Sequence, residues 1–174
     1  MTRFFTTAAR LLVTASVGLA RDMPLSQIVI PGEGWKKVAS PGARPTAPRP
    51  NPLTTLSADR GTAFIAARER LLWAAPVGSQ GSVVASSAPY APIRQKPGAT
   101  QPTEVTGLAA DRNGRIYAAT EIGVQVFDPT GRMCGVLTPA AAGVPNHLAF
   151  EGDTLTLWIG NTKYAKELNT GGAK

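Results

Sequence analysis

One short sequence pattern occurs three times in the chain, and it constrains the fold more than any other feature. Each copy opens on a leucine, continues with two small or apolar residues, and has an acidic residue three positions after the leucine. The three pairs are Leu56 and Asp59, Leu108 and Asp111, and Leu148 and Glu151. Successive copies start 52 and 40 residues apart, which is close to the period of about 40 to 50 residues that β-propeller blades show.

Two apolar strands separated by a turn follow the acidic residue in every copy. The first strands are predicted at residues 63–67, 116–119 and 155–159, and the second strands at residues 71–74, 124–127 and 164–168. Their β-branched and aromatic residues exclude a helical repeat. We therefore expect an all-β fold, a partial β-propeller of about three four-stranded blades over residues 53–174, with blades starting near residues 53, 105 and 145.

Acidic residues also open two turn-like segments, D-R-N-G at 111–114 and D-P-T-G at 128–131. Asp at the first position of a β-turn accepts backbone N–H groups, proline presets φ, and glycine adopts a positive φ. We therefore interpret both segments as β-turns. Calcium binding is the alternative, although an isolated D-x-N-G lacks the downstream bidentate glutamate of a helix-loop-helix calcium site.

The first twenty residues have the pattern of a targeting segment. Residues 1–10 are basic without an acidic residue, residues 11–19 are apolar, and small residues stand at positions 18 and 20. We predict a signal peptide at residues 1–20 and hence a secreted or periplasmic protein. A presequence for an organelle and an ordinary first helix are the alternatives. The apolar stretch is too short to span a bilayer, so no membrane association is expected after cleavage.

Residues 21–40 are predicted to form an N-terminal strand pair whose two short strands are joined by a turn at Pro31 and Gly32. A proline-rich linker with five prolines in twelve residues follows at 41–52, and it should run extended. Because propellers often close by joining the two ends of the chain, this linker could let the strand pair add to a distant blade.

Charge and cysteine content argue against several classes of function. The net charge is +7, from 18 Lys and Arg and 11 Asp and Glu, but the basic residues are scattered without aromatic residues between them. We therefore expect no nucleic-acid partner. Cys134 is the one cysteine, which excludes an intrachain disulfide. In the apolar run 133–137 we interpret it as a small buried hydrophobic residue, with a reactive thiol as the alternative.

The longest sequence signal is a resemblance to a known protein family. Residues 106–120 and 123–132 resemble the late blades of the senescence-marker-protein, gluconolactonase and luciferin-regenerating-enzyme-like β-propellers. Residues 146–152 resemble the opening of the last blade in that family. The resemblance implies a propeller of the six-bladed type that hydrolyses sugar lactones or related esters. It also implies one divalent cation, calcium or zinc, at the mouth of the central channel, where it polarises the carbonyl and acidifies a water.

The family holds its cation with a Glu of an E-G-P motif, an Asn of a P-N-G motif and an Asp of a D-G-[ML] motif. No E-G-P segment occurs in this chain. Glu33 belongs to the predicted N-terminal strand pair, ahead of the first blade, and is not the equivalent of that glutamate. The P-N-G position falls out of clean register at Asn51. Thr106 takes the place of the Asp, and a neutral hydroxyl attracts a dication much less than a carboxylate does. The carboxylate ligands of the family are therefore not found.

Four polar residues remain as candidates for the channel mouth: Asn146, His147, Thr106 and Asn51. Asn146 is the counterpart of Thr106 in the repeat and the best candidate for a metal ligand, with a turn cap as the alternative. His147 lies next to it as the lone histidine, but the chain has no G-x-S-x-G motif for a serine triad.

We therefore expect a shortened gluconolactonase-like propeller with weak or no catalysis on its own. The alternative is a metal-dependent sugar-lactone or ester hydrolase that is active as an oligomer and takes a small sugar lactone as substrate. Three blades leave two open flanks, and the terminal units of a repeat fold need covering. We expect self-association through these flanks, or else that the chain is a fragment of a longer gene product.

Overall fold

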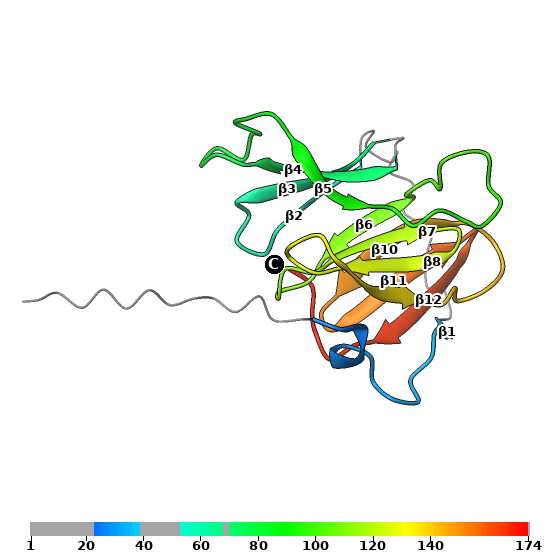
Figure 1. The fold of residues 1–174 in the computed structure, drawn as a ribbon. Helices are drawn as coiled ribbons and strands as arrows, with labels where there is room; N and C mark the ends of the chain where they lie inside the picture. The colour runs from blue at the N-terminus through cyan, green and yellow to red at the C-terminus, as the bar shows by residue number, and fades with distance from the viewer. Residues whose placement is uncertain (1–22, 39–52, 68–69, 174) are drawn as a thin grey trace, which may run out of the picture.

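The computed structural model describes residues 23–38, 53–67 and 70–173 (Figure 1). The predicted signal peptide at 1–20, the proline-rich linker at 41–52 and the site candidate Asn51 lie outside these residues, so export stays a prediction. One short 3-10 helix, η1 (Leu25–Gln27), precedes the strands. None of the helices in the described residues is long and apolar enough to cross a bilayer.

The strands form three four-stranded antiparallel sheets, which confirms the expected all-β partial propeller. The first blade is β2 (Leu53–Leu56), β3 (Thr62–Ala66), β4 (Leu71–Pro76) and β5 (Ala88–Pro92). The middle blade is β6 (Gly107–Ala110), β7 (Ile116–Thr120), β8 (Gly123–Phe127) and β9 (Met133–Leu137). The last blade is β10 (Pro145–Glu151), β11 (Thr154–Ile159), β12 (Thr162–Glu167) and β1 (Lys36–Val38).

The N-terminal segment differs from the predicted strand pair in its partners. The turn is present, with Gly32 at φ +81°, but the two extended segments do not pair with each other. Val29 forms a bridge to Leu168, and β1 pairs along β12, so both segments add to the last blade. The outer edge of β12 would otherwise expose unpaired backbone groups. The chain thus joins its two ends in one sheet, the closure that the linker was expected to allow.

Two hydrophobic clusters hold the three blades together. One lies between the middle and last blades and includes Tyr117, Val124 and Leu157. The other lies between the first and middle blades and includes Phe64 and Phe127. Because successive residues of a strand point to opposite faces, β6, β7 and β8 each contribute to both clusters. Every residue of β7 and β8 is accordingly buried.

A buried carboxylate joins the middle blade to the chain after the last blade. Asp111 is fully buried, and its Oδ1 accepts hydrogen bonds from the backbone N–H groups of Asn113, at 2.9 Å, and Arg115, at 2.8 Å. Its Oδ2 accepts from the Tyr117 hydroxyl, at 3.1 Å, and the Thr170 hydroxyl, at 3.1 Å. The β-turn interpretation of this segment is confirmed, and Gly114 follows at φ +83°.

The Arg115 guanidinium neutralises this carboxylate and extends the contact to the N-terminal segment. Its Nη1 lies 3.3 Å from Oδ2 of Asp111, and both side chains are almost completely buried. Its Nη2 donates to Gln27, in η1, at 3.1 Å. The network therefore connects the middle blade, through the buried Asp111 and Arg115, to the exposed Gln27 of η1 and to Thr170 after the last blade.

A second acidic turn joins the middle blade to the first. Oδ1 of Asp128 accepts from the backbone N–H groups of Thr130 and Arg132, which confirms the β-turn. Tyr90, on β5, donates its hydroxyl hydrogen to the carbonyl of Asp128. Gly131 has φ +85°, and a Cβ there would overlap the Tyr90 carbonyl. Only glycine therefore allows the first blade to approach this turn so closely.

Replacing Asp111 with alanine should lower the free energy of unfolding by about 3 to 5 kcal/mol, because Arg115 is left as an uncompensated buried charge. Urea denaturation monitored by circular dichroism measures the change. The matched control is Asp153→Ala, which removes a pair with Arg112 whose side chains are 58% and 69% exposed. Such a surface pair contributes about 0 to 1 kcal/mol. Equal losses in the two variants would contradict the role of Asp111.

Candidate functional site

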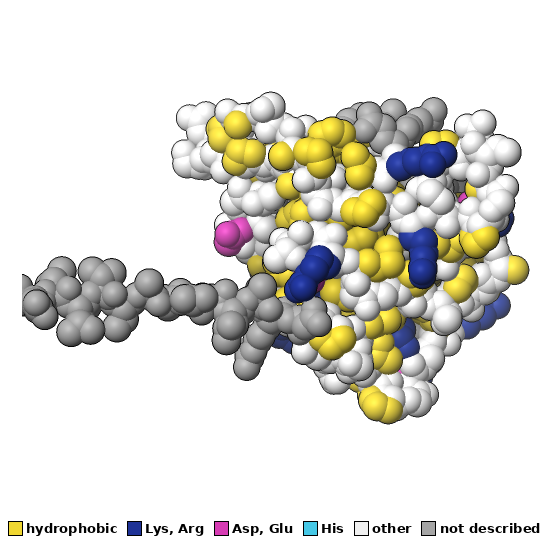
Figure 2. Space-filling view, viewed as in Figure 1, with side chains coloured by type: hydrophobic (Ala, Val, Ile, Leu, Met, Phe, Trp, Pro, Cys, Tyr) yellow, Lys and Arg dark blue, Asp and Glu magenta, His cyan; other side chains and the backbone are white. Residues whose placement is uncertain are grey.

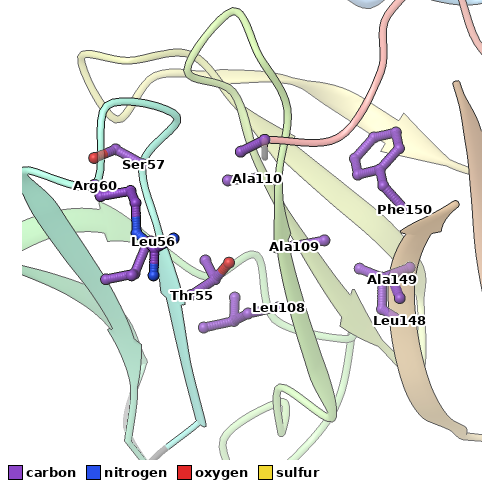
Figure 3. A pocket seen from close by; sticks show the side chains of 11 residues that line it. Thr55, Leu56, Ser57, Arg60, Leu108, Ala109, Ala110, Leu148, Ala149 and Phe150 are labelled. Atoms are coloured by element: carbon purple, nitrogen blue, oxygen red, sulfur yellow. The ribbon is translucent and has the colours of Figure 1, made fainter. Parts of the chain in front are cut away.

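The first strands of the three sheets, β2, β6 and β10, form the inner side of the fold (Figure 1). β6 and β10 touch closely, because a Cβ on Gly107 would lie 2.8 Å from the Cβ of Leu148. This explains why glycine follows Thr106 at the start of β6. A hollow of about 370 Å³ runs along the three inner strands and is lined by residues of all three blades (Figure 3). We call it the inner-strand groove.

Most of the side chains that line the inner-strand groove are apolar. Its walls come from Leu56 on the first blade, Leu108 to Ala110 on the middle blade, and Leu148 to Phe150 on the last. Thr55 and Ser57 supply hydroxyl groups. The Ser57 hydroxyl donates to Asp59 and accepts from the Thr62 N–H, so it stabilises the β2–β3 turn. Such a groove can bind an apolar body, but its lining holds no carboxylate.

Arg60 is the one charged residue that lines the inner-strand groove, and the sequence did not single it out. It has φ +61°, the left-handed region that non-glycine residues seldom adopt. The turn that fixes it is closed by its own N–H to the Ser57 carbonyl at 2.9 Å. The sequence feature that could have marked Arg60 is its position directly after Asp59, the acidic residue of the first repeat copy.

Thr106 stands at the start of β6, at the channel end where the resemblance places a ligand. Its side chain is 2% exposed, and its hydroxyl donates to the Ala119 carbonyl at 3.3 Å. Its backbone N–H donates to the same carbonyl at 2.8 Å. The hydroxyl is therefore engaged within its own blade.

Asn146 lies at a bulge between Pro145 and His147 in β10. Its Nδ2 donates to the Gly160 carbonyl, at 2.9 Å, in the turn between β11 and β12. Its Oδ1 is shielded from solvent and has no hydrogen-bond partner among the described residues. The amide thus caps a turn with one end and leaves a buried acceptor at the other.

His147 faces a different direction from the groove. It is paired with Trp158 across the strands, and Leu148, one residue later, points into the cluster with the middle blade. Because adjacent residues alternate, His147 points away from the middle blade. It is partly buried, and its backbone lies close to Gly107, the residue after Thr106, although its side chain points elsewhere.

These residues do not fit a divalent cation as the family would hold one. Calcium takes about six to eight oxygen ligands, usually with several carboxylates among them. In residues 23–38, 53–67 and 70–173, no three His, Cys, Asp or Glu side chains gather into a metal-binding group. The oxygens of Asp111 and Asp128 are occupied by their turns and by Arg115 and Arg132. Among the buried side-chain atoms of the described residues, the Oδ1 of Asn146 is an acceptor without a hydrogen-bond partner.

Cys134 lies on β9 and packs against the cluster between the middle and last blades. It is partly rather than fully buried. Burial raises the pKa of its thiol, and the nearby Asp128 carboxylate raises it further, against the opposing effect of Arg115. A thiol that stays protonated at neutral pH is a weak nucleophile, which favours a packing role.

Alkylation of Cys134 by iodoacetamide should therefore be slow at pH 7 and should rise only at higher pH than for a free cysteine. The raised pKa leaves less thiolate at neutral pH, and the thiolate is the reacting form. Mass spectrometry of the native chain between pH 6 and 10 gives the rate profile, with urea-unfolded chain as the control. A native rate equal to that of the unfolded chain at pH 7 would contradict this assignment.

Comparison with known proteins identifies the fold. No family model matches the sequence, and no curated protein matches it. A gluconolactonase from Xanthomonas campestris matches with TM-score 0.56 and 20% identity, over 68% of this chain and 37% of its own. A regucalcin from Agrobacterium tumefaciens, described as a calcium-binding protein, matches with TM-score 0.55 and 17% identity, over 71% of this chain and 46% of its own. The chain therefore has the blade fold of the gluconolactonase and regucalcin propellers and spans less than half of their length.

Proposed function

We propose that the chain is a shortened gluconolactonase-like propeller. It binds a ligand in its inner-strand groove and hydrolyses lactones weakly or not at all on its own. The observation that carries this proposal is the composition of the groove. Its lining contains one cation, Arg60, and no carboxylate. A groove of this kind can orient a ligand, but it lacks the groups that activate a water.

The chemistry of lactone hydrolysis explains why those groups matter. The cation that the family resemblance implies would polarise the carbonyl and lower the pKa of a bound water. A metal-free route would need a general base within hydrogen-bond reach of the attacking water. Asp59 is the carboxylate nearest in sequence to the groove lining, and it accepts hydrogen bonds from Ser57 and Gly61. Those hydrogen bonds lower its pKa and make it a weak base.

A metal-dependent lactone or ester hydrolase is the second candidate function, and one observation favours it. The Oδ1 of Asn146 is a buried acceptor without a partner among the described residues, and an amide oxygen is a suitable ligand for calcium. The candidate requires further ligands, which an oligomer would have to supply. Calcium and zinc are the cations to test.

Hydrolysis of glucono-δ-lactone by the purified chain distinguishes the two candidates. We expect no rate above the spontaneous reaction, with or without added calcium, zinc or manganese, because no ligand set converges in the described residues. A pH-indicator assay of acid release measures the rate. Turnover that is lost in chelator and restored by one of these metals would overturn the proposal and support the hydrolase.

Two variants then test the placement of the site. If metal-dependent turnover is found, Asn146→Ala and Thr106→Val should each lower it, and Asn169→Ala serves as the amide control because its residue is exposed. Unchanged rates in both variants would refute the placement of the metal-dependent site at the starts of β6 and β10.

A further inference from the structure

We infer that a second copy of this chain covers the two outer flanks, so that two copies form one six-bladed ring around a shared channel. This inference is independent of whether the ring hydrolyses a lactone. Its starting point is the difference between the blades. The middle blade is packed on both faces, and its two central strands are wholly buried. The first and last blades each pack one face against it.

The outward face of the first blade is uncharged in its strands. Phe64 and Ala66 point into the cluster with the middle blade, so Ile65, between them, points outward. Its cross-strand neighbours are Thr54 and Trp73, which share that face. Ile65 and Trp73 are partly exposed and Thr54 is exposed. Figure 2 shows hydrophobic side chains gathered over this blade at the top of the molecule.

The outward face of the last blade carries the exposed Glu167 and two lysines that are each paired with a carboxylate. Ala165 is the cross-strand neighbour of Thr156 and Lys36 on this face, and it is partly exposed. Lys163 lies 2.6 Å from Glu151, and its side chain is 18% exposed. Lys36 lies 2.8 Å from Glu33. Covering this face would therefore bury no unpaired lysine, which is the costly case for a charged interface.

The two faces lie at opposite ends of a three-blade unit, so a twofold rotation about the channel can bring them together. The first blade of one copy then meets the last blade of the other, and the same contact occurs twice. A head-to-tail contact of this kind forms a ring when its rotation closes. Two copies give six blades, within the range of about four to eight that propellers use.

The channel supplies the reason for choosing a second copy over another partner. The inner-strand groove is walled by β2, β6 and β10, the turn after β2 and Ala173, all within one copy, and it is only part of a channel. The similar propellers are longer, and the matched part is 37% of one and 46% of the other. A second copy supplies three further inner strands in the same direction and completes the wall. An unrelated partner would need surfaces that fit the outward faces of both the first and the last blade.

Sedimentation velocity of the full chain at physiological salt tests the ring, because each copy carries +7 and low salt would oppose association. We expect a species of twice the chain mass. Thr54→Asp on the first flank and Ala165→Arg on the last should each raise the dimer dissociation constant at least about tenfold, since each places an unpaired charge in the contact. Met133→Asp is the control, because Met133 is 37% exposed and lies on the middle blade.

Mixing the two flank variants tests the head-to-tail arrangement. One intact contact remains between the Ala165→Arg copy, whose first flank is unchanged, and the Thr54→Asp copy, whose last flank is unchanged. We therefore expect the mixture to form a tighter dimer than either variant forms alone. Circular dichroism and thermal unfolding of each variant show that it is folded. Ile65→Glu provides a second variant for the first flank.

Three results would overturn the inference. The first is a stable monomer of the unmodified chain across the concentration range. The second is a dimer that Thr54→Asp, Ile65→Glu and Ala165→Arg leave unchanged. The third is a dimer that the first-flank variants disrupt while Ala165→Arg does not, because that pattern means like flanks meet and no ring closes.

Discussion

The burial of the middle blade on both faces is the constraint on which the rest of the structure depends. An antiparallel sheet with one solvated face alternates apolar and polar residues, whereas β7 reads I-Y-A-A-T and is buried throughout. Such a sheet is stable only between two neighbours. The first blade is fixed against it through Tyr90 at the Asp128 turn, and the chain after the last blade through Thr170 at Asp111. Both contacts use acidic turns of the middle blade, and the Asp111 turn is the one that the repeat supplies.

The sequence alone predicted the three blades, because the residues that specify each hairpin lie close together in the chain. The repeat leucines, the apolar strands and the D-x-x-G turns each lie within one hairpin, and the observed strand bounds follow them closely. The strand that pairs with β1 lies far away in the sequence, so local patterns did not predict it. Whether residues 28–38 pair with themselves or with β12 depends on which sheet edge lies within reach, and that is a property of the assembled blades. β1 pairs with β12, an arrangement that the linker was said to make possible, while the pairing expected inside the segment is not seen in the described residues.

The candidate site was less predictable than the fold, because a motif position fixes where a residue lies and not where its side chain points. Thr106 occupies the expected place at the start of β6, yet its hydroxyl is bonded to Ala119. His147 adjoins Asn146 in sequence, but strand alternation turns it away from the middle blade. Arg60 was missed because a positive φ outside glycine leaves no clear mark in the sequence, and its place along the inner-strand groove depends on all three blades.

In the inferred ring, the twofold axis would bring the Arg60 residues of both copies to one channel. Two guanidinium groups in one channel raise the local potential, and protein walls of low dielectric concentrate that field. The inner-strand groove contributes no carboxylate from either copy to offset it. A neutral lactone gains little from such a field, whereas an anion with an apolar body gains both charge attraction and burial. The channel of the inferred ring would then select ligands by charge.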